Sequence, residues 1–180
     1  MKTWRDRYVT LVSLGEHAKG IEIGVYRGEN SFNLLDKLPG IKTLTCVDKW
    51  SHYDEYTRYP EAKKGNGLDY ENVYSDFSKK AEQYGSRIEV IKKTSLEAAE
   101  MFEDETFDFV FIDANHRFKY VIQDLKAWWP KVKKGGLFSG HDYVEDKNSP
   151  RYGVTMAVNK FFPKGIKKQR IVWYKRKEDG

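Results

Sequence analysis

Apolar residues fall into short unbroken runs separated by longer stretches in which they recur every three or four positions. The short runs predict strands that are buried on both faces, and the longer spacing predicts amphipathic helices. Strands are expected at 20–25, 41–48, 87–91, 107–113 and 137–141, with an edge strand at 171–174, and helices at 29–38, 69–84, 95–102, 116–129 and 154–162. This alternation predicts an α/β fold: a doubly wound, mostly parallel sheet with helices on both faces and an antiparallel edge strand near the C-terminus.

Local signals support these boundaries. Pro39-Gly40 ends the helix before it, and Thr94 with Glu97 has the spacing of a capping box at the start of a helix. One helix carries apolar residues at helical spacing, which predicts a stripe that faces the core: Phe118, Val121, Ile122, Leu125 and Trp128.

The length of 180 residues is that of one domain, so we expect a single domain over 1–180 with an N-terminal helix at about 2–18. The irregular stretch 49–67 carries several aromatic residues and predicts a substrate loop. The only cysteine, Cys46, lies in an apolar run, which favours core packing and a reducing, cytoplasmic location. The sequence contains no run of apolar residues long enough to span a membrane.

A glycine-containing turn follows the first predicted strand. Glu22, Gly24 and Gly28 lie in the strand and in the turn that leads into a helix, where a missing side chain lets backbone approach a ligand. Asp48 ends the next strand, about twenty residues on, where an acid can bind two ribose hydroxyls. Tyr26 replaces the second glycine of a dinucleotide fingerprint and is too bulky for a pyrophosphate. The pattern therefore predicts a nucleoside site of another kind.

Polar residues also follow the fourth and fifth predicted strands. Asp113 ends one strand and His141-Asp142 end the other, so their side chains reach the same edge of the sheet. Two carboxylates and an imidazole there could bind a divalent cation, and oxygen-rich ligation favours Mg²⁺ or Mn²⁺. His116 lies three residues beyond Asp113, and an ordinary imidazole pKa of about 6.5 suits a general base near neutral pH.

Together these stretches resemble the class I S-adenosylmethionine-dependent methyltransferases. The turn at 21–28 with Asp48 resembles their first motif and the acidic position after it, and 107–116, 135–136 and 140–143 resemble small O-methyltransferases of the sugar, macrolide and catechol types. The resemblance implies that Gly24 and Gly28 line the methionine and ribose part of S-adenosylmethionine. The other cofactor positions that it implies are Glu22 near the methionyl end, Asp48 at the ribose, Trp50 and Ser95 at the adenine, and Asp113 beside the sulfonium.

The resemblance also implies methyl transfer to a hydroxyl of a small-molecule acceptor such as a sugar, polyketide or phenol. His116 and Asp113 are the expected catalytic residues, and Asp113, His141 and Asp142 are the expected ligands of a Mg²⁺ or Mn²⁺ ion. Metal-dependent relatives carry an acid where His141 stands, so this position departs from their pattern.

Other functions stay open at this point. The net charge of +5 and a basic C-terminal edge are compatible with a nucleic-acid methyltransferase, although Ala114-Asn115-His116 replaces the proline-containing turn of enzymes that methylate nucleic-acid amines. A non-catalytic S-adenosylmethionine-binding module is a second alternative, and a nicotinamide oxidoreductase a remote one. Asn115 is expected to cap the helix after it, and His52 is a rival base. The sequence is compatible with a homo-oligomer and does not identify the acceptor.

Overall fold

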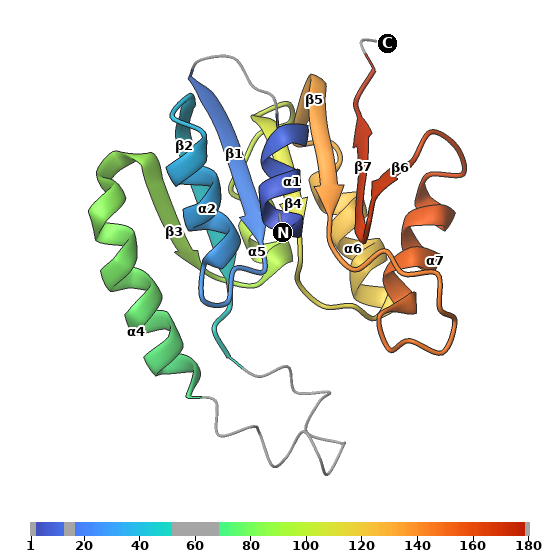
Figure 1. Ribbon diagram of the computed structural model, residues 1–180, viewed down its shortest axis with the longest axis horizontal. Helices are drawn as coiled ribbons and strands as arrows, with labels where there is room; N and C mark the ends of the chain where they lie inside the picture. The colour runs from blue at the N-terminus through green and yellow to red at the C-terminus, as the bar shows by residue number, and fades with distance from the viewer. Residues whose placement is uncertain (1–2, 13–16, 52–68, 179–180) are drawn as a thin grey trace.

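A computed structural model describes residues 3–12, 17–51 and 69–178 of the chain. The described residues form a seven-stranded sheet with strand order β3-β2-β1-β4-β5-β7-β6 (Figure 1). The strands are β1 Ala18–Ile23, β2 Ile41–Asp48, β3 Ile88–Lys92, β4 Phe107–Ile112, β5 Val132–Gly140, β6 Lys167–Gln169 and β7 Val172–Arg176. Neighbours from β3 to β5 are parallel, and β7 is antiparallel to both β5 and β6. The predicted fold class is confirmed.

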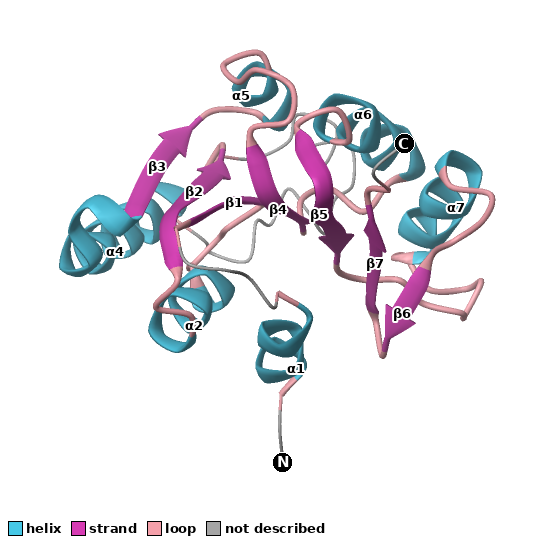
Figure 2. Ribbon diagram, turned by 90° about the horizontal axis from the view of Figure 1, so that it is seen from above, coloured by secondary structure: helices cyan, strands magenta, loops and turns pink. Residues whose placement is uncertain are grey.

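Helices cover both faces of the sheet, as Figure 2 shows. They are α1 Trp4–Leu11, α2 Glu29–Lys37, α4 Tyr70–Ala81 with the 3-10 helix η2 Glu82–Arg87, α5 Ser95–Ala99, α6 Phe118–Trp128 and α7 Tyr152–Phe161. One core lies between the sheet and α5, α6 and α7, and the other lies between the sheet and α1, α2 and α4. The capping box of Thr94 with Glu97 and the inward stripe of α6 are both confirmed. Cys46 is buried in the second core.

Several boundaries differ from the sequence expectation. The segment expected at 171–174 as the edge strand is β7, which lies between β5 and β6, so the edge strand is β6. The sequence Lys-Lys-Gln of β6 has no apolar alternation, because an edge strand of three residues buries little surface. The N-terminal helix is shorter than 2–18, since α1 ends at Leu11 and Ala18 already begins β1.

The strand order places the carboxyl ends of β1 and β4 side by side at the centre of the sheet. From β1 the chain winds outward through β2 and β3, and it then returns to β4 and continues through β5 in the opposite direction. Doubly wound sheets bind ligands in the crevice at such a reversal. Any ligand site of this type is therefore expected at the edge where β1, β2, β4 and β5 end, the lower edge in Figure 1.

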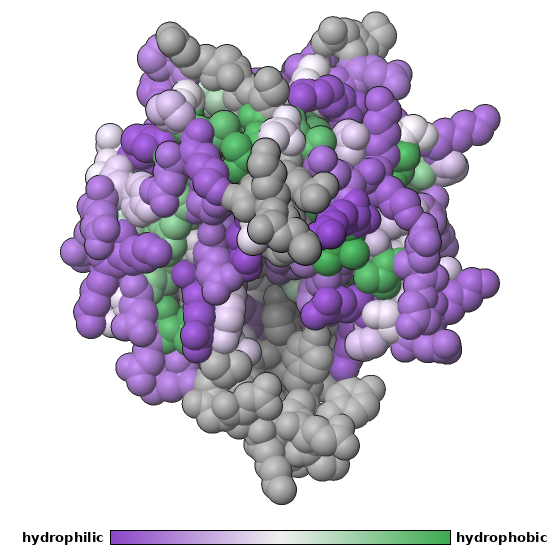
Figure 3. All heavy atoms as spheres, in the orientation of Figure 1, coloured by the Kyte–Doolittle hydropathy of each residue, from purple (hydrophilic) through white to green (hydrophobic). Residues whose placement is uncertain are grey.

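The surface carries mostly hydrophilic side chains on the face shown in Figure 3, where apolar side chains form small separate patches. Among the described helices, none combines the length and apolar character that a membrane crossing requires.

Helix α1 is fastened to the sheet by one buried side chain. Tyr8 is fully buried, and its ring lies 4.5 Å from the Phe111 ring of β4. The Ser139 hydroxyl of β5 donates to the Val110 carbonyl at 2.9 Å, so the Tyr8 hydroxyl donates to Ser139 Oγ, also at 2.9 Å. This contact fixes the helix that carries Arg5, which forms an ion pair with Glu29 at the start of α2.

Replacing Tyr8 with phenylalanine removes that hydrogen bond and leaves the ring in place. We expect the Tyr8→Phe variant to lose about 1 kcal/mol of unfolding free energy, or ~2–4 °C in Tm. Urea unfolding and calorimetry measure the two quantities. Tyr84→Phe is the control, because the Tyr84 hydroxyl bonds Asp36 at the exposed surface. A loss no larger than that of the control would show that the buried bond does not hold α1.

Candidate active site

The turn after β1 touches the end of β4 through backbone atoms alone. Gly24 has a φ of 86°, and a side-chain carbon at this position would lie 2.3 Å from the Asp113 carbonyl oxygen. The Gly24 amide donates to the Val47 carbonyl at 2.8 Å, and the Asp113 amide donates to the Ile23 carbonyl at 2.7 Å. Only glycine combines this conformation with so close an approach. The turn therefore joins the carboxyl ends of β1, β2 and β4.

Asp48, at the end of β2, holds the same turn through its side chain. Its Oδ2 atom accepts from the Val25 and Tyr26 amides at 2.9 Å each, and its Oδ1 atom accepts from the Trp50 amide at 2.8 Å. Tyr26 has a φ of 55°, a left-handed conformation that non-glycine residues seldom adopt. The Asp48 carboxylate thus orders the turn, and its Oδ1 atom retains one lone pair for another donor.

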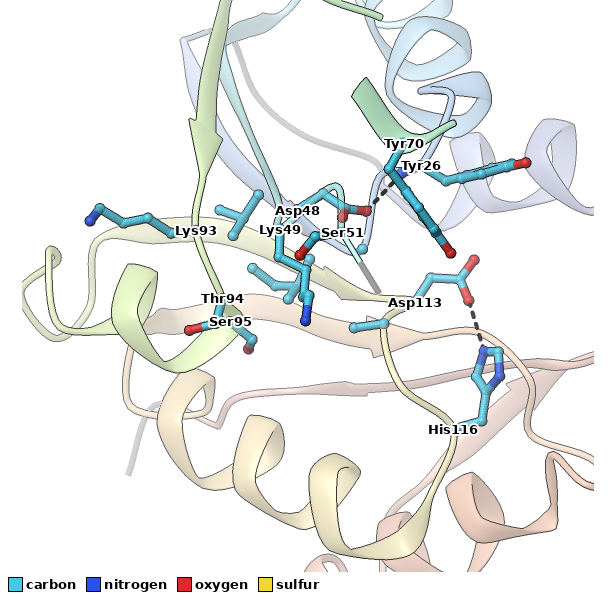
Figure 4. A pocket seen from close by; sticks show the side chains of 14 residues that line it. Tyr26, Asp48, Lys49, Ser51, Tyr70, Lys93, Thr94, Ser95, Asp113 and His116 are labelled. Carbon is cyan, nitrogen blue, oxygen red and sulfur yellow. Dashed lines mark hydrogen bonds and ion pairs between the residues drawn. The ribbon is translucent and has the colours of Figure 1, made fainter. Parts of the chain in front are cut away.

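A cavity of about 310 Å³ opens beside this turn (Figure 4). Its walls come from the carboxyl ends of β1, β2 and β4, from the β3–α5 turn and from the start of α4. Its lining residues are Ile23, Gly24, Tyr26, Val47, Asp48, Lys49, Ser51, Tyr70, Lys93, Thr94, Ser95, Asp113, Ala114 and His116. Five residues that the sequence singled out, Gly24, Asp48, Ser95, Asp113 and His116, therefore line one cavity.

Two of the expected cofactor residues lie elsewhere. Trp50 is 1% exposed and packs against the Tyr74 and Phe77 rings of α4, while its Nε1 atom donates to the Tyr26 carbonyl at 2.8 Å. Gly28 precedes α2, where a side-chain carbon would meet Phe77 at 2.5 Å. Both residues contact the second core, so they support the turn from the core side and do not line the cavity.

Glu22 borders a second, smaller cavity of about 110 Å³, which shares Gly24, Tyr26 and Asp113 with the first. Burial raises the pKa of Glu22 to about 8, although hydrogen bonds from Ser31 at 2.5 Å and Asn30 at 3.2 Å act to lower it. The Asn30 Oδ1 atom is buried and makes no hydrogen bond with any described residue. A buried acceptor without a donor is costly, so this atom indicates a place where a ligand could donate.

Side chains that follow β4 and β5 form a cluster at the other side of the cavity. His116 Nε2 lies 2.9 Å from Asp142 Oδ2 and 3.7 Å from Asp113 Oδ1. His141 Nδ1 lies 3.1 Å from Asp142 Oδ1 and 3.7 Å from Asp113 Oδ1. The strand order thus brings all four side chains together.

The charges in this cluster stabilise one another. Burial acts to lower the pKa of His116, but the carboxylates of Asp113 and Asp142 outweigh it and raise that pKa to about 9. Burial acts to raise the pKa of Asp142, yet the two imidazole rings hold it well below its usual range. The pKa of His116 is therefore higher than the ordinary imidazole pKa expected from the sequence, because the chain brings Asp142 next to His116 from the end of another strand. At neutral pH the His116 ring is a cation paired with these carboxylates.

Three members of the cluster could share a metal ion. One ligand atom each from Asp113, His141 and Asp142 lies within 4.8 Å of the others. The Asp142 Oδ1 atom is buried, and two basic side chains already approach it: His141 Nδ1 at 3.1 Å and Arg151 Nη1 at 3.3 Å. Two carboxylates and an imidazole form a mixed oxygen and nitrogen set that suits Mg²⁺ less well than Mn²⁺.

Some lining residues were not singled out from the sequence. Lys49 and Ser51 follow the end of β2, and Tyr70 begins α4, with its hydroxyl pointing toward Asp113 in Figure 4. Lys49 could have been found from the sequence, because it directly follows Asp48. Nothing in the sequence places Tyr70 beside the cavity. Most of the predicted substrate loop, with His52, lies outside the described residues.

Asn115 does not cap α6 as expected, because the N-cap residue is Arg117. The Asn115 Oδ1 atom accepts from the Arg117 amide at 2.9 Å and so orders the turn before the helix. His116 lies in this turn, and its direction is therefore fixed by a local hydrogen bond.

Comparison with known proteins identifies a family. The family described as "Methyltransferase domain" matches residues 21–143, which include the glycine turn, Asp48 and the polar cluster. An uncharacterised protein of Acanthamoeba polyphaga mimivirus is 30% identical over 144 residues, which are 78% of this chain and 57% of that protein. The chain thus spans little more than half the length of this curated relative.

Solved structures share the fold at low sequence identity. A proposed caffeoyl-CoA O-methyltransferase from Staphylococcus aureus has a TM-score of 0.67 at 16% identity, covering 98% of this chain and 84% of that one. The 1,6-didemethyltoxoflavin-N1-methyltransferase of Burkholderia thailandensis, solved with S-adenosylhomocysteine, has a TM-score of 0.63 at 13% identity and covers 97% and 78%. These likenesses establish the fold alone.

The raised pKa of Glu22 predicts a pH-dependent contribution to stability. Between the ordinary value of 4.5 and the folded value of about 8, the folded protein keeps a proton that the unfolded chain releases. The stabilisation is complete below pH ~4.5 and is lost as the pH rises through about 8. Glu22→Gln cannot titrate, so the wild-type protein should lose at least ~1 kcal/mol relative to this variant between pH ~5 and ~8.

Urea unfolding of both proteins across this pH range measures the difference between their unfolding free energies. Groups that titrate equally in both proteins cancel in this difference. Parallel stability curves for the two proteins would contradict the prediction.

Proposed function

The chain belongs to the methyltransferase domain family and is a class I S-adenosylmethionine-dependent methyltransferase, and from this premise we propose that it methylates a hydroxyl group of a small molecule. A sugar, a polyketide or a phenol is the expected acceptor. The observation that carries the proposal is that one cavity contains both the glycine turn with Asp48 and the pair of Asp113 and His116. A donor site and a group able to move a proton are thus adjacent.

The two connected cavities fit the two ends of the donor. Asp48 and the β3–α5 turn border the larger one and would hold the ribose and the adenine, with Ser95 on the adenine side. Arg5 and Asn30 border the smaller one and would meet the carboxylate and the ammonium of the methionine end. The buried Asn30 Oδ1 atom supports this orientation, because an ammonium group is the donor that it lacks. S-adenosylmethionine supplies the methyl group as an electrophile.

Asp113 borders both cavities, so the reacting carbon would lie next to it and to His116. Holding the acceptor oxygen in line with the methyl group is the largest expected contribution, of order ~7–11 kcal/mol in favourable cases. We assign His116 as the group that takes the hydroxyl proton, since its Nε2 atom faces the carboxylates at this junction. Its present proton is shared with Asp113 and Asp142 and must leave before the ring can act as a base.

Asp113, His141 and Asp142 would hold a divalent cation, Mg²⁺ or Mn²⁺, at the same place. The fit rests on the 4.8 Å grouping of their ligand atoms and on the two carboxylates among them. Such an ion would lower the pKa of the acceptor hydroxyl. A cation bound by the two carboxylates would also offset their effect on His116 and lower its pKa. The neutral imidazole could then accept the proton of the acceptor hydroxyl.

Titration calorimetry with S-adenosylhomocysteine tests the donor site. We expect one site per chain with micromolar affinity, and tighter binding or a separate heat when Mn²⁺ or Mg²⁺ replaces a chelator. Gly24→Val should abolish binding, because its side chain would meet the Asp113 backbone. Circular dichroism checks that this variant folds. Failure of the wild-type protein to bind would remove the proposed function, whereas binding that ignores metal would remove only the ion.

Replacing His116 with alanine tests the base. We expect turnover to fall ~10²- to 10⁴-fold across a panel of sugar and phenol acceptors, with little change in S-adenosylhomocysteine affinity. Release of S-adenosylhomocysteine measures turnover. His17→Asn is the control, since His17 is exposed and precedes β1 at the opposite end of that strand. Turnover equal to that of the control would remove His116 as the base.

A further inference from the structure

A buried carboxyl group lies behind the wall of the larger cavity. Asp124 is 4% exposed on the inner face of α6, whose neighbouring buried residues Val121, Leu125 and Trp128 are apolar. Burial raises the pKa of Asp124 to about 7, and a hydrogen bond from Ser95 acts to lower it. A buried carboxyl group costs more than an apolar residue at such a place, so a role beyond packing is indicated.

Ser95 connects Asp124 to the cavity. The Ser95 hydroxyl donates to Asp124 Oδ1 at 2.5 Å, and the Trp128 Nε1 atom donates to Ser95 Oγ at 2.9 Å. A hydroxyl has one proton and two lone pairs. Above pH ~7, where Asp124 is ionised, both the proton and one lone pair of Ser95 are used by residues of α6. Ser95 then has a single free lone pair and no proton to offer.

The remaining lone pair faces away from α6. The bonds and lone pairs around Ser95 Oγ are arranged tetrahedrally. Because Asp124 and Trp128 both contact Oγ from α6, the remaining lone pair points to the side opposite that helix. Ser95 lines the larger cavity, next to Thr94 and Lys93 in Figure 4. The Lys93 amide donates to the Asp48 carbonyl at 3.1 Å, and the Thr94 capping box closes the turn. The position of Ser95 is therefore fixed from both sides.

We propose that Asp124 is a positioning residue that makes Ser95 a hydrogen-bond acceptor only, so that the cavity selects a purine with an exocyclic amino group over one with an oxo group. The inference rests on the proposed function, because it places the donor nucleoside in this cavity. An amino group donates to the free lone pair of Ser95. The oxygen of an oxo-purine has only lone pairs to present, and the two acceptors repel each other.

Calorimetry above pH ~8, where Asp124 is ionised, compares two ligands that differ at this one group, S-adenosylhomocysteine and S-inosylhomocysteine. We expect the wild-type protein to prefer the adenosyl ligand about tenfold, which corresponds to ~1.4 kcal/mol. Ser95→Ala removes the lone pair and should bring the two affinities close together. Asp124→Asn should narrow the preference severalfold, because an amide nitrogen can donate to Ser95 and let the hydroxyl proton turn toward the base.

Asp104→Asn is the matched control, since Asp104 is exposed and pairs with Lys131 away from the cavity. It should keep the wild-type preference. Equal affinities in the wild-type protein, a full preference in Ser95→Ala, or a full preference in a folded Asp124→Asn variant would each overturn the inference. If Asp124→Asn fails to fold by circular dichroism, the wild-type preference measured from pH ~6 to ~8 decides, because a protonated Asp124 would donate to Ser95 and release the serine proton toward the base. A preference that does not rise with pH would then overturn the inference. Failure of both ligands to bind the wild-type protein is the separate outcome that removes the proposed function.

Discussion

The contact between two backbones, at Gly24 and at Asp113, is the constraint on which the site depends. No side-chain carbon fits between them, and the amides on either side donate to neighbouring strands, so the carboxyl ends of β1, β2 and β4 form one rigid edge. Because parallel strands all end on this edge, an acid that follows one strand lies close to an acid that follows another. The distance from Asp48 to the polar cluster is therefore set by the sheet and not by a loop.

The same residues that would bind the donor also hold the fold in place around it. Asp48 accepts two amides from the β1 turn and keeps Tyr26 in a left-handed conformation, and Trp50 closes the other side by donating to the Tyr26 carbonyl. The strain of that conformation persists only where its surroundings determine it fully. A ligand hydroxyl that donates to the remaining lone pair of Asp48 Oδ1 would meet a carboxylate that is already oriented, so little ordering remains to oppose binding.

The fold and most of the cavity could be predicted because they follow from periodicity and strand order. Buried strands, the glycine turn and Asp48 are local patterns, and the winding rule then gathers their ends. Features that depend on three-dimensional neighbours could not be predicted in this way. Trp50 has a φ of 40°, which turns its side chain into the core instead of the cavity. Tyr70 lines the cavity from the start of α4, and no periodic pattern in the sequence before it predicts that position. The pKa of His116 depends on Asp142, 26 positions away and on another strand's end.

Three carboxyl groups are buried in or directly behind the cavity walls, and each is stabilised differently. Glu22 lines the smaller cavity, while Asp124 contacts Ser95 and Asp142 contacts His116, which both line the larger one. Burial favours the neutral form of Glu22, Asp124 is bonded by a serine, and Asp142 stays ionised between imidazole rings. Apolar residues of similar size would usually stabilise a protein more than such groups do. The concentration of these groups around one crevice is therefore better explained by ligand binding than by folding. The buried Asn30 Oδ1 atom, which lacks a hydrogen bond among the described residues, supports this view, because Asn30 lines the smaller cavity, where a cationic group of a ligand would complete the arrangement.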